Sequence, residues 1–300
     1  TDSLNPVVSF NTNYFGSLGL FPAIVIGAVT AEIFRFFYKR KWTLSSKNIP
    51  DFVNKWFSPI IPGFVILLLG WVVTYVLDFN IFTVITRILT PILTVNDSLA
   101  AIILCSFIAN LMWVFGIHPA AVYSVIIPFL LAAWGENVAM ASQGLAPTHI
   151  NTAQTLGSWI LLGGTGTTLT LNFLLLRSKS ATLRGVGKAA LIPSIFNINE
   201  PLVYGIPIAM NPSLAIPLLL NGGIINPALT WLAMTYGLVK IPYTQMLLLQ
   251  APAGLGAFLA NQDWRGVVLV VILLAINLAV WYPFYKGYEK IVLAKETDGK

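Results

Sequence analysis

The chain has 300 residues, of which 57% are hydrophobic and 9% are charged, and its mean hydropathy is +0.80. Soluble domains are about one quarter charged, so this composition excludes an ordinary water-soluble protein and predicts an integral membrane protein. The net charge of +6 arises from 17 Lys and Arg against 11 Asp and Glu. Beside membrane spans, such basic residues indicate orientation in the bilayer rather than nucleic-acid binding.

Several long hydrophobic stretches are predicted to be membrane-spanning helices. A helix needs about 20 residues to cross about 30 Å of hydrocarbon, where its backbone must form hydrogen bonds within itself. The polar start of the chain, residues 1–13, has neither an initial Met nor the basic region of a signal peptide, so we expect the natural N-terminus to be missing. The predicted spans cover residues 16–37, 58–77, 98–117, 153–176, 213–236 and 266–285.

Three groups of basic residues predict the orientation of the chain. Of the 17 Lys and Arg, 14 lie in residues 35–55, 177–188 and 286–300. The positive-inside rule places all three groups, and with them the C-terminus, in the cytoplasm. The chain must then cross an odd number of times between Lys188 and Arg265, and residues 213–236 provide that crossing.

Two further apolar segments are interrupted too often to span the bilayer. Prolines break residues 189–212, and a proline with two glycines breaks residues 243–262. We predict two re-entrant hairpins that dip from opposite faces toward one midplane region, as in the substrate sites of transporters. Residues 98–117 and 119–134 are expected to cross as a pair, and residues 79–93 to lie at the interface or dip partway. The predicted fold is an all-α integral membrane protein, a multi-helix bundle with two opposed re-entrant hairpins.

The same pattern predicts three regions along the chain. Residues 1–97 are expected to be the remainder of an N-terminal scaffold and dimerisation region. Within it, residues 39–57 mix basic and aromatic side chains, which suits an amphipathic helix on anionic headgroups at the cytoplasmic surface. Residues 98–290 are expected to form the transport core with the hairpins, and residues 291–300 a cytoplasmic tail.

Glu200 is the strongest candidate for a functional residue. It is an acidic residue well inside a hydrophobic region, where a carboxylate costs several kcal/mol unless it faces a polar cavity or a partner. Asn197, Asn199 and Asn211 lie near it in a proline-rich segment. Their amides could contact a ligand or replace the backbone donors that proline removes, and the sequence leaves both roles open.

Four other features carry weaker predictions. His118 could bind a proton, donate a hydrogen bond or satisfy a local carbonyl, whereas His149 is expected to be a solvated loop histidine. Residues 163–168, rich in Gly and Thr, lack the Lys of a phosphate-binding loop and are expected to serve helix packing inside a span. Cys105, the single cysteine, is expected to be a small buried residue, and no metal or cofactor is predicted.

The run Asn-Ile-Asn-Glu-Pro-Leu-Val-Tyr-Gly-Ile-Pro-Ile-Ala-Met-Asn-Pro at residues 197–212 resembles the motif of a known family. That family is the EIIC membrane component of bacterial sugar phosphotransferase systems, in its lactose/cellobiose/diacetylchitobiose group. The run Trp-Val-Phe-Gly-Ile-His at residues 113–118 is similar to the second motif of the family. The resemblance covers essentially the whole chain, although family members carry additional N-terminal helices.

The resemblance implies a homodimer in the bacterial inner membrane that binds and translocates a disaccharide. It also implies phosphorylation of the sugar 6-hydroxyl by the cysteine phosphate of a separate EIIB component. Glu200 matches the glutamate that binds sugar hydroxyls, and His118 matches the histidine thought to contact the sugar and take the hydroxyl proton. Asn197, Asn199 and Gln250 are further predicted sugar ligands.

Two departures from the family pattern and two other functional readings stay open. Pro119 stands where the family commonly has Gly, and Leu249 and Gln250 stand near the place of a sugar-stacking Trp, so the sugar is not identified. An ion-coupled secondary sugar transporter could use Glu200 and His118 as a proton pair. A membrane receptor that binds sugar without moving it is the third reading.

Overall fold

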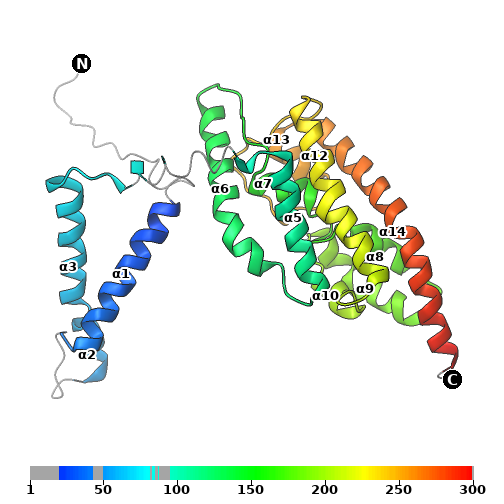
Figure 1. Ribbon diagram of the computed structural model, residues 1–300, viewed down its shortest axis with the longest axis horizontal. Coiled ribbons are helices and arrows are strands. Elements are labelled where there is room, and N and C mark those ends of the chain that lie inside the picture. Colours follow the sequence, from blue (N-terminus) through cyan, green and yellow to red (C-terminus); the bar gives the residue numbers. More distant parts are fainter. Residues whose placement is uncertain (1–19, 43–49, 82, 85–86, 88–94, 299–300) are drawn as a thin grey trace. The chain divides into compact units, whose positions relative to one another are not determined.

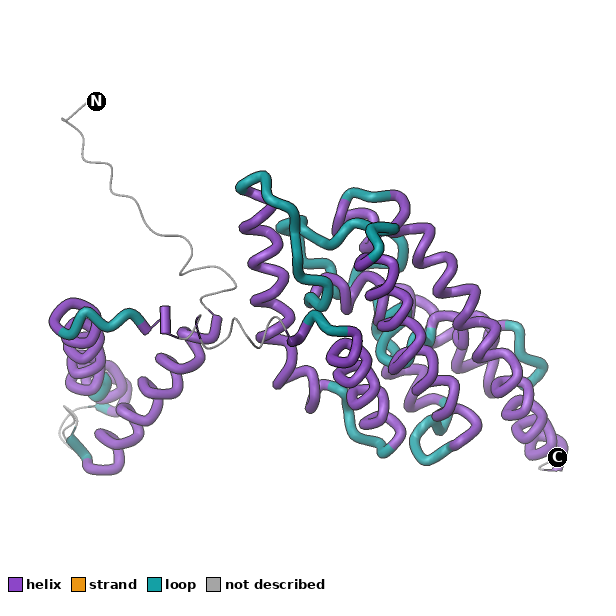
Figure 2. The backbone as a smooth tube through the Cα atoms, turned by 45° about the horizontal axis from the view of Figure 1, so that its top comes forward, coloured by secondary structure: helices purple, strands orange, loops and turns teal. Residues whose placement is uncertain are grey.

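The computed structural model describes residues 20–42, 50–81, 83–84, 87 and 95–298. It divides the chain into two compact units, Thr1–Pro91 and Ile92–Lys300, and each unit is described by itself. All regular secondary structure in the described residues is helical (Figures 1 and 2). The prediction of an all-α protein is therefore confirmed.

The smaller unit consists of α1 (Leu20–Arg40), α2 (Asp51–Phe57) and α3 (Ile60–Trp71), which continues as the π-helical turn η3 (Val72–Val76). Large apolar side chains face outward along it, with Leu67 74% and Tyr75 77% exposed. Such a surface suits lipid or another apolar partner. Of the predicted amphipathic helix at 39–57, residues 43–49 lie outside the described residues, as do most of residues 79–93.

The larger unit is a bundle in which long helices alternate with short ones. Two of its helical segments are π-helical turns, η4 and η5. In chain order the helices are α5 (Leu99–Val114), α6 (Ala120–Ser142), α7 (Ala153–Thr155), η4 (Leu156–Ile160), α8 (Leu169–Leu176), α9 (Ala181–Ile195), α10 (Glu200–Gly205), α11 (Pro212–Leu218), η5 (Leu219–Ile225), α12 (Asn226–Thr235), α13 (Leu255–Asn261) and α14 (Trp264–Asp298).

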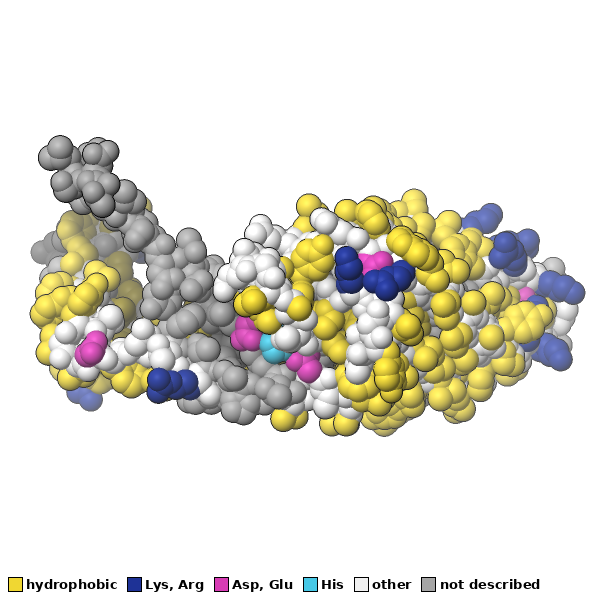
Figure 3. All heavy atoms as spheres, turned by 90° about the horizontal axis from the view of Figure 1, so that it is seen from above, with side chains coloured by type: hydrophobic (Ala, Val, Ile, Leu, Met, Phe, Trp, Pro, Cys, Tyr) yellow, Lys and Arg dark blue, Asp and Glu magenta, His cyan; other side chains and the backbone are white. Residues whose placement is uncertain are grey.

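Four helical stretches among the described residues are long and apolar enough to cross a membrane, and they confirm four predicted helices. They are Phe52–Val76, Ala120–Ser142, Pro212–Thr235 and Trp264–Thr297. The shorter α5 is also apolar and has 16 residues. Hydrophobic side chains cover much of the face of the larger unit that Figure 3 shows. Lys and Arg form one group in the middle of this face, beside an acidic side chain, and another toward the end that holds the C-terminus.

The predicted span at 153–176 is wrong, because the structure breaks this segment in the middle. The helical part ends at Ile160, a loop follows, and α8 begins only at Leu169. Gly163, Gly164 and Gly166 in that loop have positive φ angles of 86°, 97° and 94°, which glycine adopts without steric cost. These glycines therefore lie in a loop between two helical segments instead of packing inside one helix.

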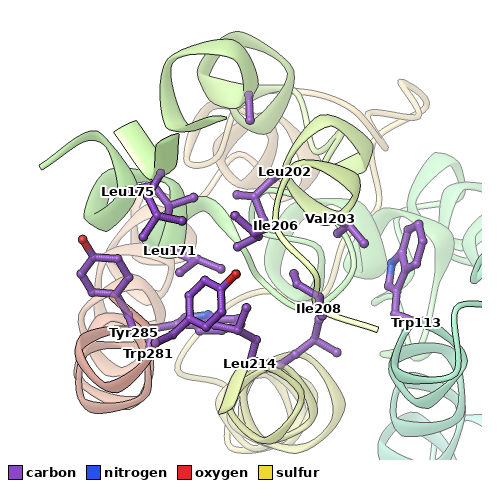
Figure 4. Packing of buried hydrophobic residues seen from close by; sticks show 14 residues of the cluster. Trp113, Leu171, Leu175, Leu202, Val203, Ile206, Ile208, Leu214, Trp281 and Tyr285 are labelled. Atoms are coloured by element: carbon purple, nitrogen blue, oxygen red, sulfur yellow. The ribbon is translucent and has the colours of Figure 1, made fainter. Parts of the chain in front are cut away.

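A hydrophobic cluster anchors the short helix α10, which begins at Glu200. Leu202 of α10 and Ile206, the residue that directly follows the helix, are at most 1% exposed. They pack in one cluster with residues of α8, α11 and α14 (Figure 4), among them Trp281. Between helices in a membrane, close van der Waals packing of such side chains is a main source of attraction. The cluster thereby fixes α10, and with it the position of its first residue.

Candidate functional site

His118 lies in the turn between α5 and α6, which correspond to the two segments predicted to cross as a pair. The end of α5 is set by Gly116, whose φ of +75° is typical of the residue that ends a helix. The amide of Ile117 donates to the carbonyl of Met112 at 2.8 Å, and the amide of Met210 donates to the carbonyl of Val114 at 2.8 Å. The second bond joins the two motif segments directly, because Met210 follows α10 in the chain.

Glu200 is the first residue of α10, and the local sequence explains why the helix begins there. Asn197 has a positive φ of 60°, a conformation that Asn tolerates better than most residues, and it separates α9 from α10. Asn199 is the N-cap and Pro201 lies at the start of the helix, where its missing N–H costs nothing. The positive end of the helix favours the negative charge of Glu200.

The two motif residues meet: His118 Nε2 lies 3.1 Å from Glu200 Oε1. The amide of Ala120 donates to His118 Nδ1 at 3.1 Å, so Nδ1 carries the lone pair and, in the neutral ring, Nε2 carries the proton. His118 therefore donates its hydrogen bond to Glu200. The other carboxylate oxygen, Oε2, is buried and finds no hydrogen-bond partner among the described residues.

A cavity of about 320 Å³ lies beside this pair, within the range of about 300–1,000 Å³ that is usual for small-molecule sites. Its lining comes from α5, α6, the glycine-rich loop and the start of α10. The Trp113 ring stands edge-on to His118, with ring centroids 4.9 Å apart. The side chains that define the cavity include Trp113, His118, Tyr123, Thr165, Asn199 and Glu200.

The two predicted asparagine ligands have different surroundings. Asn199 lines the cavity, is 3% exposed and donates from Nδ2 to the carbonyl of Thr165 at 2.6 Å. Asn197 also lines the cavity, but its amide bonds three backbone groups, in Gly157, Gly163 and Leu249. Its side chain thus satisfies backbone groups, one of the two roles that the sequence left open. Its direct contact with a ligand stays a prediction.

Gln250 and Asn211 lie away from this cavity. Gln250 is exposed and does not line the cavity, so its role as a sugar ligand stays a prediction that the geometry does not strengthen. Asn211 bonds only within its own segment, to the carbonyl of Pro207 and the amide of Ser213. Its side chain therefore satisfies backbone groups at the start of α11.

His149 is not the solvated loop residue that the sequence predicted. Its side chain is only 13% exposed, and its two ring nitrogens contact two carboxylates. Nδ1 lies 2.5 Å from Asp97 Oδ2 and Nε2 lies 2.7 Å from Glu136 Oε2. The prediction failed because both partners are distant in sequence.

The carboxylates also decide the charge of this second histidine. Burial alone disfavours the imidazolium, but the hydrogen bonds and charges of Asp97 and Glu136 outweigh it and raise the pKa of His149 to about 9. His149 is therefore protonated at neutral pH and donates from both ring nitrogens. Asp97 Oδ1 additionally accepts from the amide of Asn151 at 2.9 Å, so the cluster ties three chain segments together.

Comparison with known proteins agrees with the paired motifs. The profile of the family described as "Phosphotransferase system, EIIC" matches residues 2–222. The chain belongs to this EIIC family. The "Lichenan permease IIC component" of Bacillus subtilis is 32% identical over 292 residues, which cover 94% of this chain and 64% of that protein.

Two further relatives bear on this EIIC chain. The "PTS system cellobiose-specific EIIC component" of Geobacillus stearothermophilus is 30% identical over 94% of this chain and 65% of its own length. The crystal structure of ChbC, the IIC component of the N,N'-diacetylchitobiose-specific phosphotransferase system, superposes with a TM-score of 0.88. It is 29% identical, over 96% of this chain and 68% of ChbC. The chain thus spans about two thirds of the length of these relatives, and it shares the EIIC fold.

Sequence reasoning did not place Trp113, Tyr123 or Thr165 in the site. Trp113 could have been found, because it lies in the same motif as His118. Thr165 could not, because it was expected inside a spanning helix. Its approach to the cavity depends on the loop formed by the glycines on either side of it.

Proposed function

We propose that this chain acts as a sugar-specific EIIC permease of a phosphoenolpyruvate-dependent phosphotransferase system. It binds a disaccharide of the cellobiose, chitobiose or lactose type in the cavity beside His118 and Glu200. The observation that carries the proposal is the meeting of these two residues at a cavity, with one carboxylate oxygen left without a partner. The sugars in the names of the relatives, lichenan, cellobiose and diacetylchitobiose, support the substrate class.

A carboxylate is well suited to this substrate. Sugar hydroxyls donate to charged oxygens in hydrogen bonds that contribute about 1.5–3 kcal/mol each. A buried oxygen without a partner costs about 1–3 kcal/mol, so a hydroxyl that satisfies Glu200 Oε2 gains from both effects. Asn199 and the aromatic ring of Trp113 add polar and apolar surface to the same cavity.

The proposed reaction transfers a phosphoryl group to the sugar. The sugar 6-oxygen attacks the phosphorus of the EIIB cysteine phosphate, the P–O bond forms, the P–S bond breaks, and the thiolate leaves. The hydroxyl proton passes to the His118–Glu200 pair. Since His118 Nδ1 accepts from Ala120 and Nε2 donates to Glu200, the carboxylate is the proton acceptor of the pair and His118 orients it.

The remaining parts of the proposal concern partners and placement. The separate EIIB component is the phosphoryl donor, and relatives named as EIICB components exist, such as the lactose-specific one of Lacticaseibacillus casei. The protein acts as a homodimer that crosses the bacterial inner membrane several times, with its C-terminus in the cytoplasm. Residues 1–97 form the scaffold and dimerisation region, residues 98–290 the transport core, and residues 291–300 the cytoplasmic tail.

A vesicle assay tests the function. Purified protein is reconstituted, labelled cellobiose is added outside, and phosphorylated EIIB is enclosed inside. Labelled sugar phosphate inside is the expected product, and unphosphorylated EIIB serves as the control. Accumulation of free sugar driven by an ion gradient without EIIB would overturn the proposal in favour of a secondary transporter, and binding without any turnover would favour a receptor.

A further inference from the structure

Asn197 is the residue at which three separate parts of the larger unit meet. Its Nδ2 donates to the carbonyl of Gly157 in η4 at 2.9 Å and to the carbonyl of Leu249 at 3.1 Å. Its Oδ1 accepts from the amide of Gly163, in the glycine-rich loop, at 2.9 Å. A single amide thus joins η4, this loop and the segment before α13.

The chain segments joined by these bonds are packed closely against one another. A Cβ atom at Gly157 would lie 2.5 Å from the Cα of Leu249, so only glycine lets the two backbones approach. In the same way, a Cβ at Gly164 would lie 2.5 Å from the Cγ of Asn199. The loop therefore packs directly on the side chain that precedes Glu200.

Asn197 also lies three residues before Glu200 in a short connection with a fixed backbone. Its positive φ of 60° ends α9, and Asn199, which bonds Thr165 of the loop at 2.6 Å, begins α10. Leu248 has a second anchor, because its amide donates to Gln154 Oε1 at 2.9 Å. Gln154 and Asn197 thus both bind the backbone of residues 248–249, and of these two side chains Asn197 is the one close to Glu200 in the sequence.

We infer that Asn197 is a positioning residue that couples the segment around Leu249 to the carboxylate of Glu200. It acts through backbone groups, so that a change in the Leu249 segment is transmitted to the His118 cavity and sugar binding orders that segment. This inference rests on the proposed sugar site for its functional consequence. The mechanical link itself does not depend on the identity of the ligand.

Two substitutions separate the side-chain bonds from the backbone conformation. Asn197→Gly keeps the positive φ and loses all three bonds. Asn197→Asp keeps the oxygen that accepts from Gly163 and loses the donors to Gly157 and Leu249. The matched control is Asn211→Ala, since Asn211 belongs to the same motif but bonds only within its own segment.

The experiment measures spin-label mobility and cellobiose affinity in the same samples. The background carries Cys105→Ser, because Cys105 is a free cysteine, and Leu247→Cys for the label, because Leu247 is exposed next to this segment. A label at Leu238, 63% exposed, is the distant reference. Without sugar, both Asn197 variants are expected to make the label at 247 more mobile, while the label at 238 and the Asn211→Ala control stay unchanged.

With cellobiose, the label at 247 is expected to become less mobile in the unsubstituted background and to respond weakly in the Asn197 variants. Losing two of these hydrogen bonds in Asn197→Asp, or all three in Asn197→Gly, should weaken affinity at least about tenfold. Unchanged mobility at 247 in both variants would overturn the inference. So would an unchanged affinity for cellobiose together with a full response of the label to the sugar. If the background does not bind cellobiose at all, the proposed function fails, while the sugar-free mobility still tests the link.

Discussion

The larger unit contains two histidine–carboxylate contacts that differ in exposure, in their position relative to a cavity and in how completely their polar atoms are paired. The side chains of His118 and Glu200 are 45% and 42% exposed and lie at a cavity, and one oxygen of Glu200 has no partner among the described residues. His149 is 13% exposed and contacts a carboxylate through each ring nitrogen. A saturated, partly buried contact stabilises structure, whereas an unsaturated contact at a cavity can bind a ligand.

The largest expected effect is on stability, at the saturated contact. His149→Ala leaves Asp97 and Glu136 without the cation between them. Because this ion pair is only partly buried, its loss should cost about 3 kcal/mol, the lower end of the range for fully buried pairs. Thermal unfolding in detergent should show a clear loss for this variant. His118→Ala, the matched control at the open contact, should change the unfolding midpoint far less. Equal losses in the two variants would contradict the distinction between the contacts.

The pH dependence of stability should report on the same cluster. The pKa of His149 is raised from 6.5 in the unfolded chain to about 9 in the folded one, a difference that contributes about 3 kcal/mol. Because the raised pKa belongs to the folded state, the contribution is complete below pH 6.5 and is lost as the pH rises through about 9. Unfolding measured from pH 6 to pH 10 should show this decline, and His149→Gln should flatten it. A decline of equal size in His149→Gln would assign it to other groups.

At the open contact the expected effect is on binding. Glu200→Gln keeps the size of the side chain and removes the charge, so each hydrogen bond from a sugar hydroxyl weakens. We expect affinity for cellobiose to fall more than about tenfold, measured by titration calorimetry, with unfolding temperature unchanged. Unaltered affinity would remove Glu200 from the site.

The smallest expected effect is at Gln250, where the sequence-based prediction and the cavity disagree. Because Gln250 is exposed and outside the lining of the cavity, Gln250→Ala should change cellobiose affinity less than about twofold, which is below about 0.5 kcal/mol. A loss as large as that of Glu200→Gln would place Gln250 at the sugar. The comparison of these two variants defines the edge of the site.

The parts of the fold that follow local rules could be predicted from the sequence. Hydrophobic length predicted α14, and the proline-rich motif predicted an interrupted segment that carries Glu200. The expected crossing of residues 98–117 and 119–134 as a pair predicted α6 and placed His118 at the turn between them. These features depend on residues close together in the chain.

The parts that depend on distant partners could not be predicted. His149 was expected in solvent because Asp97 and Glu136 lie 52 and 13 residues away. Residues 163–168 were expected in a helix because glycine also occurs inside membrane helices. The repair role of Asn197 became clear only once Leu249 and Gly157 were located beside it.

A structure of the protein with bound cellobiose would show directly whether Glu200 binds the sugar. We expect the disaccharide in the cavity beside Trp113, with a sugar hydroxyl within about 3 Å of a Glu200 carboxylate oxygen, the usual distance of such a bond. The His149 cluster should keep its two carboxylate contacts. A sugar bound elsewhere, with Glu200 still lacking a partner for Oε2, would contradict the account.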